Sequence, residues 1–219
     1  MFNSTQSTRS IFEQALLSLA AYADYTGVSF GSKSAMFGAI HASLQSQLSD
    51  VVATYISENF GVVQYQSNTS TGYSGTLFQR RSPLNGDPTN GFTLAIRGTE
   101  IGTADDWGTA LLQLLPGGLA YTQAKDMLRQ WDGILAGSMG YTIDPSQFAQ
   151  LQSSMINVTG HSSGGSLAVQ FANSRASALN AAFTYNGAGN AYVDRLRVPA
   201  ARISNFIGTA YPDVIERAG

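Results

Sequence analysis

The chain has 219 residues, of which 43 % are hydrophobic and 12 % are charged, with a formal net charge of −2. This length and apolar content suffice for one domain with a full core, and the small net charge excludes strong electrostatic attraction to nucleic acid or an anionic membrane. Because cysteine is absent, a disulfide framework, a thiolate metal site and a cysteine nucleophile are excluded.

The first part of the chain has the periodicity of helices. Residues 10–25 predict one helix, with Ser10 as the N-cap and Glu13 completing a capping box. Residues 34–58 predict either one long or two shorter amphipathic helices, because apolar residues recur there at mostly helical spacing. The N-terminus lacks the basic start of a secretory signal peptide, and no stretch of 18 apolar residues predicts a membrane span.

From residue 60 the apolar period changes to two, and strands then alternate with helices. Strands are predicted at residues 60–65, 73–80, 92–96, 155–159, 181–186 and 202–207. Helices are predicted between them at residues 104–115, 119–136 and 145–152, and again from residue 163. This alternation indicates an α/β fold with a mostly parallel sheet, and the leading helices are expected to cover an edge or a face of it.

The stretch from Gly160 to Gly164 matches the motif G-x-S-x-G, with Ser162 at its centre. A buried strand pattern precedes the motif and a helix pattern follows it, as in a nucleophile elbow. In such an elbow the serine occupies a sharp turn that exposes its hydroxyl, and glycines are needed where the strand and the helix approach each other. The alternative is a glycine-rich helix start without chemistry, since short glycine and serine motifs arise by chance in a chain with 23 glycines.

Several segments together resemble the class 3 lipases of the α/β-hydrolase fold, with greatest similarity to the lipase domains of large bacterial secreted lipases that carry calcium-binding repeats. The segments are Tyr-Ser-Gly-Thr-Leu-Phe from residue 73, Leu-Ala-Ile-Arg-Gly-Thr-Glu from residue 94 with Asp106-Trp107, Gly-His-Ser-Ser-Gly-Gly from residue 160, Thr-Tyr-Asn-Gly-Ala-Gly-Asn from residue 184 and Tyr-Pro-Asp-Val from residue 211. They occur in the family's order. Ser163 departs from the family pattern, which usually has a bulky apolar residue there.

The resemblance implies that Ser162 is a nucleophile and that the backbone N–H groups of Thr99 and Ser163 stabilise an oxyanion. Asp213 follows a predicted strand and matches the family's triad acid, whose role would be to orient a histidine. Asp194 is the alternative candidate for this acid. The alternatives are that residues 97–99 merely end a buried strand and that Asp213 belongs to a surface turn. Arg97 and the Asp106-Trp107 pair are expected to be structural, beside the oxyanion hole.

The triad base is missing, because no histidine follows Asp213. His161 is expected to point away from the Ser162 hydroxyl as a packing residue, and His41 lies out of chain order in an N-terminal helix. Three interpretations remain open. In the first, the chain is truncated before its catalytic histidine. In the second, it is a pseudoenzyme or binding module that holds an acyl ligand without turnover, and in the third, His41 or another subunit supplies the base.

We therefore predict one incomplete α/β-hydrolase domain over residues 1–219 that cleaves carboxylic esters of lipids through an acyl-enzyme on Ser162. Lipase, phospholipase and short-chain esterase activities all fit. No cofactor is expected in the chemistry, and any calcium site is expected in a missing downstream region. The expected partners are a lipid or small ester, a lipid surface contacted peripherally, and a second copy pairing through an exposed sheet edge, but not nucleic acid. The low charge favours an extracellular location.

Overall fold

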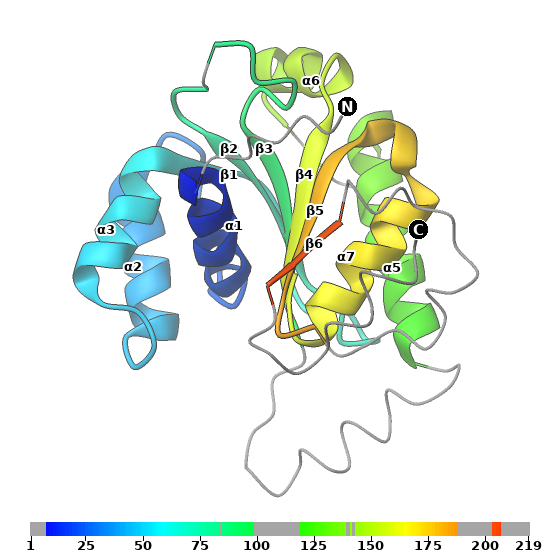
Figure 1. Ribbon diagram of the computed structural model, residues 1–219. Helices are drawn as coiled ribbons and strands as arrows, with labels where there is room; N and C mark the ends of the chain where they lie inside the picture. The colour runs from blue at the N-terminus through cyan, green and yellow to red at the C-terminus, as the bar shows by residue number, and fades with distance from the viewer. Residues whose placement is uncertain are drawn as a thin grey trace, which may run out of the picture.

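The computed structural model describes residues 8–83, 85–98, 119–138, 141, 143–187 and 203–206 (Figure 1). These residues include a six-stranded sheet in which the strands lie side by side in chain order. The strands are β1 (Phe60–Gln66), β2 (Gly75–Arg80), β3 (Phe92–Ile96), β4 (Ile156–His161), β5 (Leu179–Tyr185) and β6 (Ile203–Phe206).

The sheet is mostly parallel, as predicted. β2 pairs antiparallel with both β1 and β3, whereas β3 to β6 pair parallel, so β2 alone of the described strands runs against the others. The register places Ile96 opposite Gly160. The carboxyl ends of β3 and β4 therefore meet at the same end of the sheet, and the chain after Ile96 emerges beside the elbow that follows β4.

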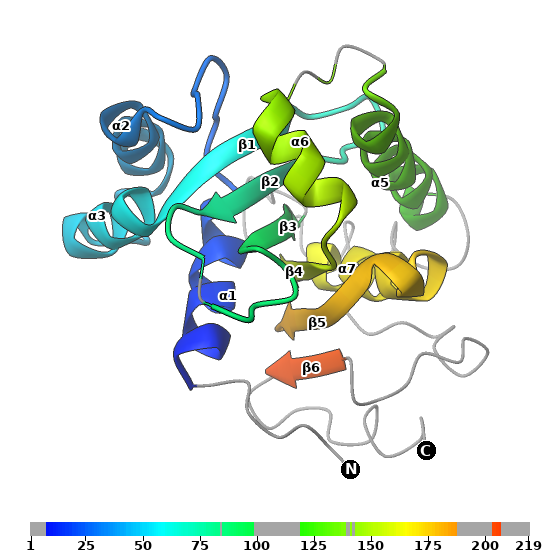
Figure 2. The same ribbon diagram turned by 90° about the horizontal axis from the view of Figure 1, so that it is seen from above.

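Helices cover both faces of the sheet (Figures 1 and 2). One face is covered by the three N-terminal helices and the other by α5 and α7, while α6 lies near the end where β4 begins. Among the described helices, none is long and apolar enough to cross a membrane. The helical elements are α1 (Thr8–Ala20), α2 (Lys33–Leu44), α3 (Asp50–Asn59), α5 (Leu119–Ala136), α6 (Pro145–Gln152), α7 (Ser163–Ser174) and the short 3-10 helix η1 (Ala176–Ala178).

Each face of the sheet has its own hydrophobic core, because successive residues of a strand point to opposite faces. In β3, Leu94 and Ile96 pack with Trp131 of α5 and Phe171 of α7. Ala95, between them, belongs to the core formed with the N-terminal helices. Burial on both faces explains why this strand reads as a continuous apolar run rather than as an alternating one.

The segment at residues 34–58 forms two helices, which decides between the two predicted arrangements. Ser32 and Ser49 are the N-caps of α2 and α3, and their hydroxyls accept hydrogen bonds from the backbone N–H groups of Ala35 and Val52. Each cap satisfies one of the N–H groups that a helix start leaves without a partner.

The prediction for the first helix is wrong in two respects. Ser10 lies inside α1 rather than at its N-cap, and the helix ends at Ala20 rather than near residue 25. At this end the carbonyl of Ala20 accepts from the buried Tyr25 hydroxyl at 2.8 Å, while the Asp24 N–H, which would continue the helix, donates to Ser43 Oγ. Glu13 forms no capping box but takes part in a buried ion pair.

That ion pair joins α1 to the sheet. The Glu13 carboxylate accepts hydrogen bonds from Arg80 Nη1 and from the Tyr55 hydroxyl, each at 2.6 Å, and from Arg9 Nε at 2.9 Å. Burial by itself raises the pKa of Glu13, but the hydrogen bonds from Tyr55, Arg80 and Arg9 outweigh it, so the pKa lies below its ordinary value. Glu13 is therefore ionised at neutral pH, and its ion pair with Arg80 anchors α1 to β2.

Candidate active site

Ser162 occupies a sharp turn between β4 and α7. Its backbone has φ 55° and ψ −126°, a combination that residues with a Cβ rarely adopt. Two hydrogen bonds hold this turn, from the Ser162 N–H to the carbonyl of Tyr185 and from the Gly165 N–H to the carbonyl of Ser162, both at 3.0 Å. Strain of this kind costs about 1–3 kcal/mol and persists only where the surrounding structure enforces it, typically at functional sites.

The flanking glycines are required because backbones meet at this turn. A Cβ on Gly160 would lie closer than 3.0 Å to the carbonyl of Gly164 in the first turn of α7. A Cβ on Gly164 would collide in the same way with the carbonyl oxygen of Ile96 at the end of β3. The two glycines of the motif therefore permit the close approach of strand and helix that an elbow needs.

We expect Ser162→Gly to be more stable than Ser162→Ala by about 1–2 kcal/mol, because both variants lose the hydroxyl but only glycine relieves a positive φ. Urea denaturation of the two variants measures the difference. An alanine variant as stable as the glycine variant would show that the turn carries no strain.

Ser163 is the first residue of α7 and is buried, with 3 % of its surface exposed. Its backbone N–H therefore lies at the positive end of the helix dipole, next to Ser162. Thr99, Asp213 and Asp194 lie outside the described residues, as do Asp106 and Trp107. Their roles remain predictions, and the same holds for the helix predicted at residues 104–115.

Both histidines of the chain are described, and each has a partner other than Ser162. His161 Nδ1 lies 3.1 Å from the Tyr22 hydroxyl, and the two rings meet edge to face with centroids 6.1 Å apart. Burial lowers the pKa of His161, so its ring is neutral at pH 7. His41 Nδ1 lies 2.9 Å from Asp50 on an exposed surface and stacks on Phe37.

Sequence reasoning did not identify Tyr22 as part of this region. Its hydroxyl lies against Gly98, where a Cβ would approach it closer than 3.0 Å. The same Cβ would lie 2.6 Å from the carbonyl oxygen of His161 and 3.3 Å from Ser162 Cβ. Because Tyr22 precedes the elbow by about 140 residues, no local pattern links the two.

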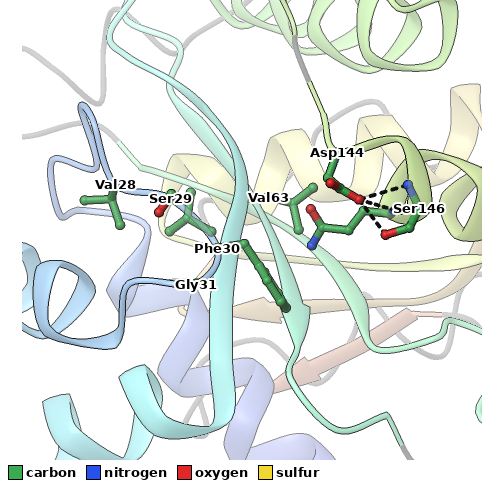
Figure 3. Close-up of a pocket in the computed structure, with 9 residues that line it drawn as sticks. Val28, Ser29, Phe30, Gly31, Val63, Asp144 and Ser146 are labelled. Carbon is green, nitrogen blue, oxygen red and sulfur yellow. Dashed lines mark hydrogen bonds between the residues drawn. The ribbon is translucent and has the colours of Figure 1, made fainter.

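Cavities of the described structure that are not lined by Ser162 include one along β1 and one beside Glu13. The larger, of about 550 Å³, lies along β1 and has apolar walls from Val28, Phe30, Val62 and Val63. In Figure 3, Asp144 at its rim accepts hydrogen bonds from Ser146. The smaller, of about 70 Å³, lies beside Glu13. Among the described residues, no three His, Asp or Glu side chains are grouped to hold a metal ion.

Comparison with solved structures shows lipases with a similar fold. The chain aligns with the Lip2 lipase of Yarrowia lipolytica with a TM-score of 0.57 and 18 % identity, over 93 % of this chain and 71 % of that one. The lipase of Rhizopus microsporus var. chinensis aligns with a TM-score of 0.47 and 12 % identity, over 84 % and 59 % of the two chains. The Rhizomucor miehei lipase, in a propeptide complex, aligns with a TM-score of 0.48 and 16 % identity, over 83 % and 54 %.

No protein-family model and no curated protein matches the sequence. The chain spans 71 % of Lip2 but less than two thirds of the other two lipases. Together with the mostly parallel sheet flanked by helices, the likeness to Lip2 identifies an α/β-hydrolase-like fold. This confirms the predicted fold class.

Proposed function

We propose that this chain is a serine hydrolase that cleaves carboxylic esters of lipids through an acyl-enzyme on Ser162. The backbone of Ser162 is the observation that carries the proposal, because a non-glycine residue at φ 55° between a strand and a helix is the arrangement of a nucleophile elbow. Ester hydrolysis as the reaction is supported by the resemblance of the motifs to class 3 lipases and by the lipase fold of Lip2.

In the proposed reaction Ser162 Oγ attacks the ester carbonyl and gives its proton to a base, and the carbonyl oxygen becomes negatively charged. The Ser163 N–H and the Thr99 N–H are proposed to stabilise this charge, and the position of Ser163 at the start of α7 supports its part in this role. Collapse of the intermediate releases the alcohol with the proton from the base, and water then frees the acid in a second cycle. Asp213 is proposed to orient the base.

Neither histidine of the chain is bonded to Ser162 in the described residues, so the base is the open element of the mechanism. His161 is engaged with Tyr22, and His41 with Asp50. A serine without a base is a weak nucleophile. The proposal for the substrate is correspondingly broad and covers triacylglycerols, phospholipids and short-chain esters. A lipid surface, calcium and an extracellular location remain proposals that rest on the resemblance and on the low charge.

We expect Ser162→Ala to reduce hydrolysis of a short-chain chromogenic ester by at least about 1,000-fold, as for loss of a nucleophile in a serine hydrolase. Steady-state rates of the 219-residue chain provide the test. Ser174→Ala, an exposed serine at the other end of α7, is the matched control and should keep the full rate. Equal and measurable rates with and without the Ser162 hydroxyl would refute the proposed nucleophile. A wild-type chain without turnover is the result expected both for a triad cut before its histidine and for a binding module.

A further inference from the structure

Tyr22 touches both segments that meet at the proposed oxyanion site. Its hydroxyl lies 3.1 Å from Nδ1 of His161, the residue before the nucleophile. The same hydroxyl lies against Gly98, the residue before the proposed donor Thr99, so closely that no side chain fits there. Tyr22 thus connects the end of β3 with the elbow after β4.

Helix α1, which ends two residues before Tyr22, is tied to three neighbouring strands. The Gln14 side chain donates to Thr93 of β3 at 3.0 Å, and Thr159 of β4 donates to the carbonyl of Gln14 at the same distance. Tyr185 of β5 donates to the carbonyl of Ile11 at 2.6 Å. Because these bonds fix α1 across the sheet, the turn after α1 holds the Tyr22 hydroxyl in one place above the strand ends.

On the side away from Tyr22, the end of β3 and the elbow are in direct backbone contact. Gly164 in the first turn of α7 lies against the carbonyl of Ile96 and the backbone of Arg97. The elbow is therefore held against the end of β3 by backbone packing on one side and by Tyr22 on the other. These two contacts act together with the pairing of Ile96 with Gly160 and the close approach of Gly98 to the His161 carbonyl, which also hold the two segments together.

An oxyanion site built from two segments depends on that separation. Its donors must lie within about 2.7–3.1 Å of the charged oxygen, and a misplacement of about 1 Å can cost 100-fold in rate. We propose that Tyr22 is a positioning residue that sets the spacing of Gly98 and the elbow, on which the proposed oxyanion site depends, by bonding His161 on one segment and packing on Gly98 of the other. The inference rests on the proposed function of Ser162.

The test is Tyr22→Phe, which keeps the ring and removes the hydroxyl. We expect kcat for a chromogenic ester to fall about 10- to 100-fold while KM stays within about twofold, since the donors act on the transition state rather than on the bound substrate. The backbone amide resonances of Gly98 and Ser163 should shift as well, because both segments lose a common support. Tyr55→Phe is the matched control, since its hydroxyl binds Glu13 of α1, the helix that precedes Tyr22, but away from the elbow.

The outcomes separate this inference from the proposed function. If Ser162→Ala abolishes turnover and Tyr22→Phe leaves kcat within about twofold, the positioning role is refuted and the nucleophile stands. If the wild type shows no Ser162-dependent turnover, the 219-residue chain lacks the proposed activity, and the amide resonances alone decide whether Tyr22 has the positioning role. Unchanged Gly98 and Ser163 resonances in Tyr22→Phe would overturn the positioning role, and shifts equal to those in Tyr55→Phe would overturn it too.

Discussion

Replacement of Gly164 by alanine is expected to destabilise the fold by about 3 kcal/mol or more, at the upper end of the range for over-packed positions. The new methyl group would lie closer than 3.0 Å to the carbonyl oxygen of Ile96 and at 3.0 Å from the backbone of Arg97. These neighbours are backbone atoms of a buried strand, so they cannot swing aside as the end of a long side chain would. The collision can be relieved only by separating α7 from β3.

Urea denaturation followed by tryptophan fluorescence measures this loss, since Trp131 is buried in the core beside α7. Gly38→Ala is the matched control, because Gly38 lies inside α2 and a Cβ there meets nothing within 4 Å. That variant should gain about 0.5–1 kcal/mol from the higher helix propensity of alanine. A Gly164 variant within about 0.5 kcal/mol of the wild type would contradict the close approach described for the elbow.

The elements of the fold were predictable because their signals are local. Apolar periodicity located β3 at residues 92–96 and α6 at residues 145–152 with the bounds that the structure has. It also marked the change from helices to strands at Phe60. The elbow was predictable for the same reason, since Gly160, Ser162 and Gly164 carry its requirements within five residues.

The partners of buried polar groups were not predictable from such patterns. Glu13 matched a capping box, but its carboxylate is bound by Arg80, which is 67 residues away in sequence. Tyr22 and His161 are separated by 139 residues. Such pairs depend on which strands become neighbours and on which face a helix crosses them, and a local hydrophobic pattern encodes neither.

The candidate site was therefore predictable in part. The turn at Ser162 and the helix start at Ser163 are present as predicted, and the roles of these residues as nucleophile and oxyanion donor stay predictions. Thr99 and Asp213 lie outside the described residues and remain predictions. The contribution of Tyr22 became visible only through the sheet order, which brings the ends of β3 and β4 together beneath the turn after α1.

Arg80→Met is expected to lower the free energy of unfolding by about 3–5 kcal/mol at pH 7, because it leaves the buried Glu13 carboxylate without its strongest cation. Arg80 and Glu13 are each about nine-tenths buried, and the Arg80 guanidinium also lies over the Phe60 ring at 5.2 Å. Adding Glu13→Gln should recover much of the loss, since no buried charge then remains. Lys33→Met, which breaks the exposed pair with Glu58, should cost less than about 1 kcal/mol.

The pH dependence of the Arg80 variant distinguishes loss of charge pairing from loss of packing. In the wild type the pKa of Glu13 lies below its ordinary value, so the stability that Glu13 contributes is complete above that value and is lost as pH falls through the folded pKa. Without Arg80, its hydrogen bond and its charge no longer lower the pKa of Glu13, so this pKa rises relative to that in the wild type. Acidification therefore costs the folded variant less stability at Glu13 than it costs the wild type. Urea denaturation from about pH 7 to about pH 4 should therefore show a narrowing difference between variant and wild type. A difference that stays constant over this range would mean that Arg80 acts through packing on Phe60 rather than through the Glu13 carboxylate.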